Sequence, residues 1–225
     1  LLQKGCSNEK GVAVLIGIVD YGMGNLFSVY NAIERLGADS VISSDPAVLN
    51  QCDGLILPGV GAFRDAMLAL KEQKLDLFLK EFVDSERPML GICLGMQLLF
   101  ESSDEHGFSE GLCFLDGHIA KFTGIDQTGK TYKVPHMGWN KLHFEKEHPL
   151  LEGLTEDYVY FVHSYYAQVK DSAELIATAS YDVEVPGIVG KDNVMGMQFH
   201  PEKSGWMGKG LLNNFIKLVN EGCER

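Results

Sequence analysis

The first half of the chain alternates short apolar runs with stretches in which apolar residues recur every three or four positions. The runs predict buried strands at residues 12–19, 53–59 and 88–92, with a shorter strand at 40–43. The stretches between them predict amphipathic helices at residues 26–36, 63–71 and 74–84. Strands that alternate with helices are typical of an open, mostly parallel, twisted α/β sheet flanked by helices. In such sheets, ligands bind at the carboxyl ends of the strands.

After residue 101 the pattern changes to short apolar segments separated by turn residues. These segments predict strands at residues 111–122, 132–134, 141–144, 158–166 and 175–180, and a hairpin of residues 185–189 and 194–199. A final apolar stripe predicts a closing helix through Leu211, Leu212, Phe215, Leu218 and Val219. No linker and no repeat divides the chain, so we expect residues 14–225 to form a single domain whose β-rich C-terminal half completes the sheet. Residues 1–13 are expected to be a disordered extension or a vector remnant.

Charge and composition narrow the classes of function. The 225 residues carry a formal net charge of −12, which argues against nucleic acid or an anionic membrane as the main partner. The longest apolar run is too short for a membrane span, and the polar start of the chain lacks the order of a secretory signal. Five cysteines without a C-x-x-C pair indicate neither a disulfide framework nor a zinc site, so we expect a reduced, cytoplasmic setting.

Motifs for cofactors and metals are incomplete. The sequence D-Y-G-M-G-N at residues 20–25 resembles half of a dinucleotide-binding fingerprint, but the third glycine is missing. Neither H-E-x-x-H nor H-x-x-x-H occurs, which leaves a metal site without support. We therefore expect the protein to need no cofactor and no metal.

The predicted strand at 88–92 runs into a cysteine flanked by two glycines. Cys93 lies between Gly91 and Gly95, and from Gly95 onward the apolar residues follow helical spacing as far as Phe100. This G-x-C-x-G pattern is the thiol counterpart of the nucleophile elbow, a sharp strand-to-helix turn that needs small neighbours. Such a turn exposes the sulfur at a helix N-terminus, where unpaired N–H groups can stabilise a thiolate. A buried cysteine at the end of a core strand is the alternative.

A cysteine nucleophile needs a base and a third group that orients the base. His200 ends the predicted strand at 194–199, and Glu202 follows two residues later. Residues two apart in an extended segment project to the same side, so Glu202 can hold one imidazole nitrogen while the other faces Cys93. Taken alone, the two residues are more typical of a surface pair at a strand end. With Cys93 at another strand end of the same sheet, they favour a Cys-His-Glu triad.

A glycine-rich turn on the neighbouring strand can supply donors for an oxyanion. The sequence P-G-V-G at residues 58–61 ends the predicted strand at 53–59, and its backbone N–H groups can face the same site as Cys93. The N–H of Leu94, directly after the cysteine, is the usual second donor of an elbow. Removing one such donor typically costs about 3 kcal/mol in the transition state. P-G-x-G is also a common turn with no catalytic meaning.

These motifs, in this order, resemble the class I (triad) glutamine amidotransferases. The resemblance rests on P-G-V-G at 58–61, G-I-C-L-G-M-Q at 91–97 and F-H-P-E at 199–202. Three further segments resemble the glutaminase subunits of imidazole glycerol phosphate synthase: D-Y-G-M-G-N-L at 20–26, P-H-M-G-W-N at 135–140 and Y-F-V-H-S-Y at 160–165. The resemblance covers about residues 14–219 and implies a flavodoxin-like α/β fold.

The resemblance also implies a role for each matching residue. Cys93 attacks the side-chain amide of glutamine, and His200, oriented by Glu202, protonates the leaving ammonia and then activates water. The N–H groups of Val60 and Leu94 hold the oxyanion. The resemblance also implies five residues that contact the substrate glutamine: Gly61, Gln97, Glu105, Ser164 and Tyr165. Ser164 stands where the family commonly has threonine, and this change keeps the hydroxyl.

The resemblance implies a partner as well, and this partner consumes the ammonia. The expected partner is a separate (β/α)8-barrel cyclase that forms a heterodimer with the chain and receives ammonia through a sheltered channel. The cyclase makes imidazole glycerol phosphate and an aminoimidazole carboxamide nucleotide for histidine synthesis. The expected docking face comprises Pro135, Met137, Trp139, Asn140 and Tyr160. The alternative for Trp139 is burial near the site.

The family further suggests that the partner activates the glutaminase by reshaping the turn at 58–61. Because Gly59 and Gly61 offer little steric resistance to a peptide flip, we hypothesise that the N–H of Val60 points away from the site in the free subunit. Three other functions agree less well with the motifs. They are a glutaminase of another pathway, a catalytically inactive module with the same fold, and a cysteine peptidase or a DJ-1-like protein.

Overall fold

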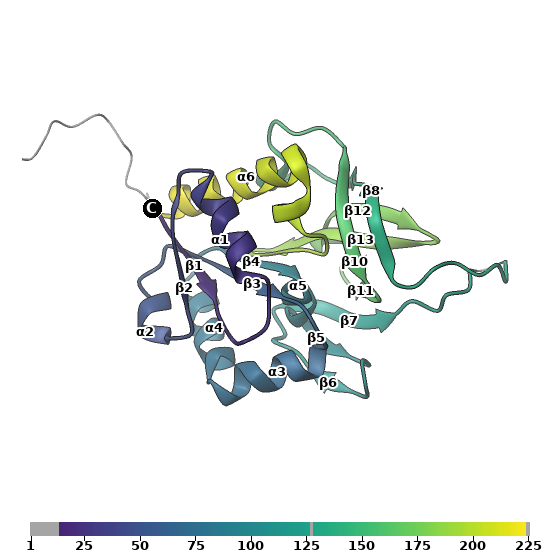
Figure 1. The fold of residues 1–225 in the computed structure, drawn as a ribbon, viewed down its shortest axis with the longest axis horizontal. Coiled ribbons are helices and arrows are strands. Elements are labelled where there is room, and N and C mark those ends of the chain that lie inside the picture. Colours follow the sequence, from purple (N-terminus) through teal and green to yellow (C-terminus); the bar gives the residue numbers. More distant parts are fainter. Residues whose placement is uncertain (1–13, 127, 224–225) are drawn as a thin grey trace, which may run out of the picture.

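A twisted eight-stranded sheet forms the centre of the protein (Figure 1). The computed structural model describes residues 14–126 and 128–223. The strand order is β2-β1-β3-β4-β14-β13-β12-β9, and the first five strands of this order run parallel. The strands are β1 (Leu15–Val19), β2 (Asp39–Ser43), β3 (Gly54–Gly59), β4 (Met89–Cys93), β9 (His143–Phe144), β12 (Leu175–Tyr181), β13 (Val183–Lys191) and β14 (Val194–Met197). The expected mostly parallel α/β sheet is confirmed.

Helices cover both faces of this sheet. They are α1 (Leu26–Glu34), α2 (Pro46–Leu49), α3 (Phe63–Glu72), α4 (Leu75–Asp84), α5 (Leu94–Leu98) and α6 (Gly205–Cys223). Helices α1 and α6 lie on one face, and α3, α4 and α5 lie on the other (Figure 1). Successive side chains of a strand point to opposite faces of the sheet. In β3, Ile56 packs with α1 and α6, whereas Leu55 and Leu57 pack with α3 and α4.

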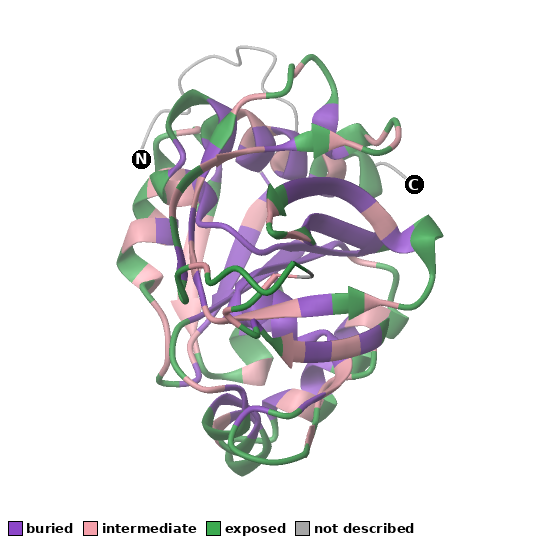
Figure 2. Cartoon of the chain, turned by 90° about the vertical axis from the view of Figure 1, so that its right-hand side faces the viewer, coloured by how far each residue is buried: buried purple, intermediate pink, exposed green. Residues whose placement is uncertain are grey.

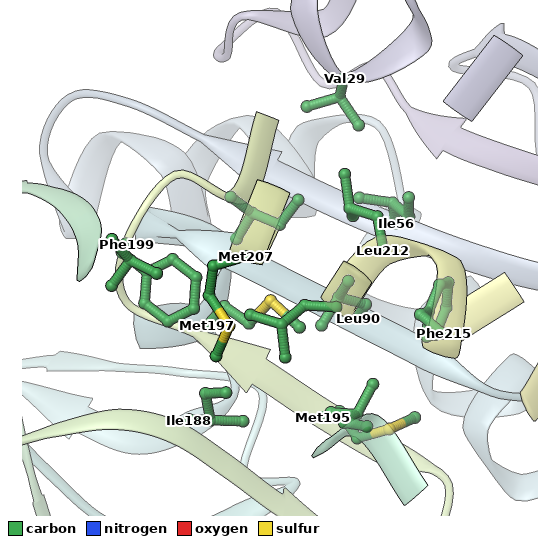
Figure 3. Close-up of a cluster of buried hydrophobic side chains, with 14 of the residues drawn as sticks. Val29, Ile56, Leu90, Ile188, Met195, Met197, Phe199, Met207, Leu212 and Phe215 are labelled. Carbon is green, nitrogen blue, oxygen red and sulfur yellow. The ribbon is translucent and has the colours of Figure 1, made fainter. Parts of the chain in front are cut away.

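The core between the sheet and α6 shows how the two halves of the chain are joined. Met207, Leu212 and Phe215 of α6 point down onto Leu90 and Met197, which come from adjacent parallel strands (Figure 3). The central strands are buried along most of their length (Figure 2). Burial of such side chains stabilises the fold by about 1.5–3 kcal/mol each. The packing thus holds the carboxyl ends of β4 and β14 side by side.

Two smaller sheets complete the structure. One has the order β11-β7-β5-β6 and the other pairs β10 with β8. Their strands are β5 (Phe100–Ser103), β6 (Ser109–Glu110), β7 (Leu115–Lys121), β8 (His136–Lys141), β10 (Tyr158–His163) and β11 (Tyr165–Val169). Short 3₁₀ turns follow at Pro149–Leu151, Ser172–Glu174 and Pro201–Lys203. The β-rich half therefore completes the central sheet with β13, β12 and β9 and builds two further sheets beside it.

Several predicted boundaries are wrong, and tertiary pairing explains most of them. The helix after Cys93 ends at Leu98, because Phe100 pairs with Leu115 in a strand. The predicted strand at 111–122 begins only at Leu115, since residues 112 and 114 are hydrogen-bonded to the carbonyl groups at the end of α5. The predicted strand at 132–134 is absent, and the strand at 136–141 was not predicted. The predicted strand at 158–166 is divided at Ser164 between two sheets.

The expected extension at residues 1–13 lies outside the described residues. In the part of the chain that the structure describes, no helix is long and apolar enough to cross a membrane. Within the same part, no group of three or more His, Cys, Asp or Glu side chains is placed to hold a metal ion.

Candidate active site

Cys93 stands at the sharp junction between β4 and α5. Its backbone has φ 55° and ψ −112°, a left-handed conformation that residues with a side chain rarely adopt. The flanking glycines allow this turn: a Cβ on Gly91 would lie 2.7 Å from the carbonyl oxygen of Gly95. β3 and β14 lie on either side of β4, so the ends of both neighbouring strands face the cysteine. The predicted elbow is present.

His200 and Glu202 follow β14, and their side chains are hydrogen-bonded. His200 Nδ1 lies 2.8 Å from Glu202 Oε1, and both side chains are almost fully buried. Burial lowers the pKa of His200, but the neighbouring side chains of Cys93 and Glu202 outweigh burial and raise this pKa to about 9. The carboxylate of Glu202 thus favours the protonated imidazole. The backbone N–H of His200 donates to the Tyr160 carbonyl at 3.0 Å, which ties the loop to β10.

A cavity of about 330 Å³ opens above Cys93. It brings together ten of the predicted residues, which come from distant parts of the sequence: Val60, Gly61, Cys93, Leu94, Gln97, Glu105, Pro135, Ser164, Tyr165 and His200. Val162 and His163 complete the lining. Its volume suits a small polar molecule of the size of an amino acid. Glu202 lies behind His200 and does not line the cavity.

Two polar side chains at the cavity wall are held by hydrogen bonds to the rest of the protein. Glu105 Oε2 accepts a hydrogen bond from the N–H of Phe63, at the start of α3, at 2.7 Å. Gln97 Nε2 donates to the Tyr165 carbonyl and to Gln198 Oε1, both at 3.0 Å. These bonds fix the orientation of the carboxylate and of the amide before any ligand enters.

Sequence reasoning missed two residues beside the nucleophile. Gln198 is fully buried, and its Nε2 lies 4.0 Å from Cys93 Sγ. Tyr21 is also buried, and its hydroxyl donates to the Pro58 carbonyl at 2.9 Å, under the turn at 58–61. Burial, and then the charge of Cys93, raise the pKa of Tyr21 well above its usual value. The one available signal for Gln198 was a polar residue inside an apolar strand.

Comparison with known proteins agrees with this geometry. The family described as glutamine amidotransferase class-I matches residues 17–218. The chain is 54% identical over 205 residues to the imidazole glycerol phosphate synthase subunit HisH of Geobacillus kaustophilus, covering 91% of this chain and 97% of that protein. It is 50% identical over 207 residues to the HisH subunit of Bacillus subtilis, covering 92% and 98%. This chain belongs to the HisH family of class I glutamine amidotransferases.

Solved structures of proteins with much lower sequence identity to this chain share its fold. A chain of PurLQS from Thermotoga maritima aligns with a TM-score of 0.70 at 18% identity, covering 92% of this chain and all of that one. A glutamine amidotransferase from the same organism aligns with a TM-score of 0.66 at 14% identity, covering 93% and 99%. At such low identity the likeness supports the fold alone.

The segment that suggested the HisH family from sequence lies at the molecular surface beside the cavity. Met137 and Trp139 project from β8 with 61% and 57% of their surface exposed, so burial of Trp139 is excluded. Trp139 packs edge-on against the half-buried Tyr160 of β10, with ring centroids 6.0 Å apart. Pro135 lines the cavity itself. Asn140 differs from these residues, because its amide points inward and donates to the Ser180 carbonyl at 2.8 Å.

Proposed function

We propose that this protein is the glutaminase subunit of an imidazole glycerol phosphate synthase. It hydrolyses glutamine to glutamate and ammonia for histidine biosynthesis, and residues 14–225 act as one amidotransferase domain. The observation that carries the proposal is the hydrogen-bonded His200–Glu202 pair at one wall of a 330 Å³ cavity whose floor is Cys93. The identity of about half of all residues to HisH subunits over nearly the whole chain supports the pathway.

The reaction begins when the Cys93 thiolate attacks the side-chain amide carbon of glutamine. As the new C–S bond forms, the carbonyl oxygen becomes an oxyanion, which the N–H groups of Val60 and Leu94 stabilise. The imidazolium of His200 gives its proton to the amide nitrogen, so the C–N bond breaks and ammonia leaves. A γ-glutamyl thioester remains on Cys93. The neutral His200 then takes a proton from water, whose oxygen attacks the thioester and releases glutamate.

The cavity wall suits the α-amino acid end of glutamine. Glu105 supplies a negative charge for the α-ammonium group, and Gln97 supplies an amide oxygen. The hydroxyl of Ser164 and the backbone at Gly61 and Tyr165 provide further polar contacts around the same space. A pocket with few fixed polar groups and otherwise apolar walls is typical for a small ligand.

We further propose that the ammonia passes directly to a (β/α)8-barrel cyclase subunit bound as a heterodimer. The docking face is built around Met137, Trp139 and Tyr160, with Pro135 and Asn140 at its margin. Exposed aromatic and methionine side chains grouped beside an active site support this assignment, because these residue types are enriched in protein interfaces.

Cys52, Cys93 and Cys113 are free thiols, which supports a cytoplasmic, reducing setting.

The turn at 58–61 provides a means of activation by the partner. Gly61 adopts φ +112°, and the Val60 side chain is 44% exposed, so the turn can change conformation without repacking the core. We infer that Val60 N–H points away from the cavity until the cyclase binds. The isolated chain should then hydrolyse glutamine far more slowly than the complex. Equal rates with and without the partner would contradict this inference.

The direct test measures glutamate release from glutamine with and without the cyclase and its nucleotide. The Cys93→Ala variant should lose all activity, because no nucleophile remains to form the thioester. Cys113→Ala is the matched control, since this exposed thiol lies outside the cavity and its removal should leave the rate unchanged. Normal activity in the Cys93→Ala protein would overturn the proposed function.

A further inference from the structure

Two buried histidines that take no part in the proposed reaction lie next to each other at the cavity, where His163 belongs to the lining and His136 lies behind it. His136 of β8 and His163 of β10 are register partners in the two-stranded sheet. Their exposed fractions are 2% and 6%, and His136 Nδ1 lies 3.0 Å from His163 Nε2. Buried imidazoles that touch only one another would leave polar atoms unsatisfied, but each of these rings has a second partner.

The partners at the two ends fix the direction of every hydrogen bond in the chain. His163 Nδ1 lies 2.8 Å from the Tyr165 carbonyl oxygen, which can only accept, so Nδ1 carries the proton. His163 Nε2 therefore accepts from His136 Nδ1, and His136 Nε2 accepts from the amide of Asn140 at 3.3 Å. The order of donation is Asn140 to His136 to His163 to Tyr165. We call these four residues the imidazole chain.

The surroundings keep both rings neutral, as this arrangement requires. Burial lowers the pKa of His136 to about 4 and that of His163 to about 3. The ring of His136 is stacked between Phe161 and Tyr181, at centroid distances of 4.6 Å and 3.9 Å. This packing also restricts rotation of the imidazole.

The inner end of the imidazole chain reaches the substrate pocket. The Tyr165 carbonyl accepts from His163 Nδ1 and from Gln97 Nε2, which uses both of its lone pairs. The second N–H of the Gln97 amide donates to Gln198. Both donors of Gln97 are thus occupied, and within the described residues no protein donor reaches its Oε1. The amide consequently offers an acceptor to a ligand in the cavity.

The outer end lies on the strand that carries the exposed aromatic face. Residues along β8 alternate in direction, so Met137 and Trp139 face solvent while His136 and Asn140 face inward. A shift of β8 under a docked partner would therefore move the first two members of the imidazole chain.

We propose that His136 and His163 are positioning residues, which hold the Tyr165 carbonyl and the Gln97 amide in the orientation that binds glutamine and link that orientation to β8. The proposal rests on the proposed function of the same cavity. Without the bond from His163, the Tyr165 carbonyl is less constrained and the Gln97 amide can turn. The turned Gln97 amide then presents an N–H group to the substrate where an acceptor is needed. This weakens substrate binding but leaves Cys93, His200 and Glu202 in place.

The first test determines the tautomers of both histidines and uses the wild-type protein in solution. In ¹⁵N-resolved NMR spectra of the full chain at neutral pH, His136 and His163 should each show a protonated Nδ1 and an unprotonated Nε2. Free histidine prefers the opposite tautomer, so the result is diagnostic. A proton on Nε2 of His163 would overturn the proposal, because the donation to Tyr165 would then be impossible.

The kinetic test compares two substitutions of one residue in the complex with the cyclase. His163→Leu retains bulk but removes the donor to Tyr165, and should raise KM for glutamine about tenfold with little change in kcat. His163→Asn keeps a side-chain N–H at the position of Nδ1 and should restore most of the loss. An unchanged KM in the leucine variant, or equal KM values in both variants, would overturn the proposal. If instead the wild-type complex released no glutamate, the proposed function would fail, while the NMR result would still decide the direction of the imidazole chain.

Discussion

A Cβ atom placed on Gly95 would lie only 1.8 Å from the carbonyl oxygen of Leu57. The first turn of α5 therefore packs directly against the backbone of β3, with no side chain between them. This contact brings the N–H groups after Cys93 close to the turn that follows β3. The second glycine of the G-x-C-x-G pattern is required by this backbone approach, not only by the sharpness of the turn.

Replacing this glycine should damage both the fold and the site. Gly95→Ala forces β3 and α5 apart, and we expect the free energy of unfolding to fall by about 3 kcal/mol, with loss of glutaminase activity. Urea denaturation monitored by circular dichroism measures the first effect. Gly222→Ala is the matched control, because its Cβ would meet only ordinary contacts with Pro88, and the exposed helix end should be as stable as before or more so. Equal stability of the two variants would refute the packing argument.

The charge of Glu202 should set the alkaline limit of activity. His200, with a pKa of about 9, must be protonated to release ammonia, so kcat/KM should fall as pH rises through that value. Glu202→Gln keeps a hydrogen-bond acceptor but removes the negative charge that favours the imidazolium. The pKa of His200 then falls, and the alkaline limit should move about one to three pH units lower.

The control for this profile is Glu221→Gln, which removes an exposed carboxylate outside the cavity. Its pH profile should coincide with that of the wild type. An alkaline limit that stays near pH 9 in the Glu202→Gln variant would show that Glu202 does not tune the base.

Sequence patterns predicted the parts of the fold that depend on local order. The apolar run that became β3 and the helical spacing of α3 and α4 were placed within one or two residues of their observed ends. The triad motifs were also readable, because each lies at a strand end and needs neighbours only a few positions away. The pairing of β4 with β14 could be seen only in the structure, because it joins segments about one hundred residues apart.

Features that arise from long-range pairing were not predictable. Phe100 has the spacing of a helical residue, but pairing with Leu115 places it in β5. Ser164 interrupts what looks like one apolar strand because the segments before and after it belong to different sheets. The imidazole chain depends on the register that sets His136 opposite His163, and no local pattern encodes that register.

The carboxylate of Glu105 should contribute to substrate affinity. Its Oε2 is held by the Phe63 N–H, and the side chain lines the cavity, so a positive group of the substrate would meet a fixed negative charge. Glu105→Gln should raise KM for glutamine about tenfold or more, since a hydrogen bond to a charged group contributes about 1.5–3 kcal/mol. The neighbouring Asp104→Asn serves as the control, because Asp104 is largely exposed and pairs with His118. Steady-state kinetics with the cyclase present separates KM from kcat, and similar KM values for both variants would remove Glu105 from the binding site.

Trp139 should anchor the partner subunit. Its indole is 57% exposed in the free chain and is supported edge-on by Tyr160, so it is available to enter a pocket on another protein. Central aromatic anchors commonly contribute 2 kcal/mol or more to association, and Trp139→Ala should therefore weaken Kd for the cyclase by about thirtyfold or more. Titration calorimetry measures this change directly. Leu77→Ala provides the matched control, because Leu77 is 60% exposed on α4, on the opposite side of the sheet from α1 and α6, and its loss should leave Kd unaltered. If the tryptophan variant binds the cyclase as tightly as the leucine variant, the docking face lies elsewhere on the surface.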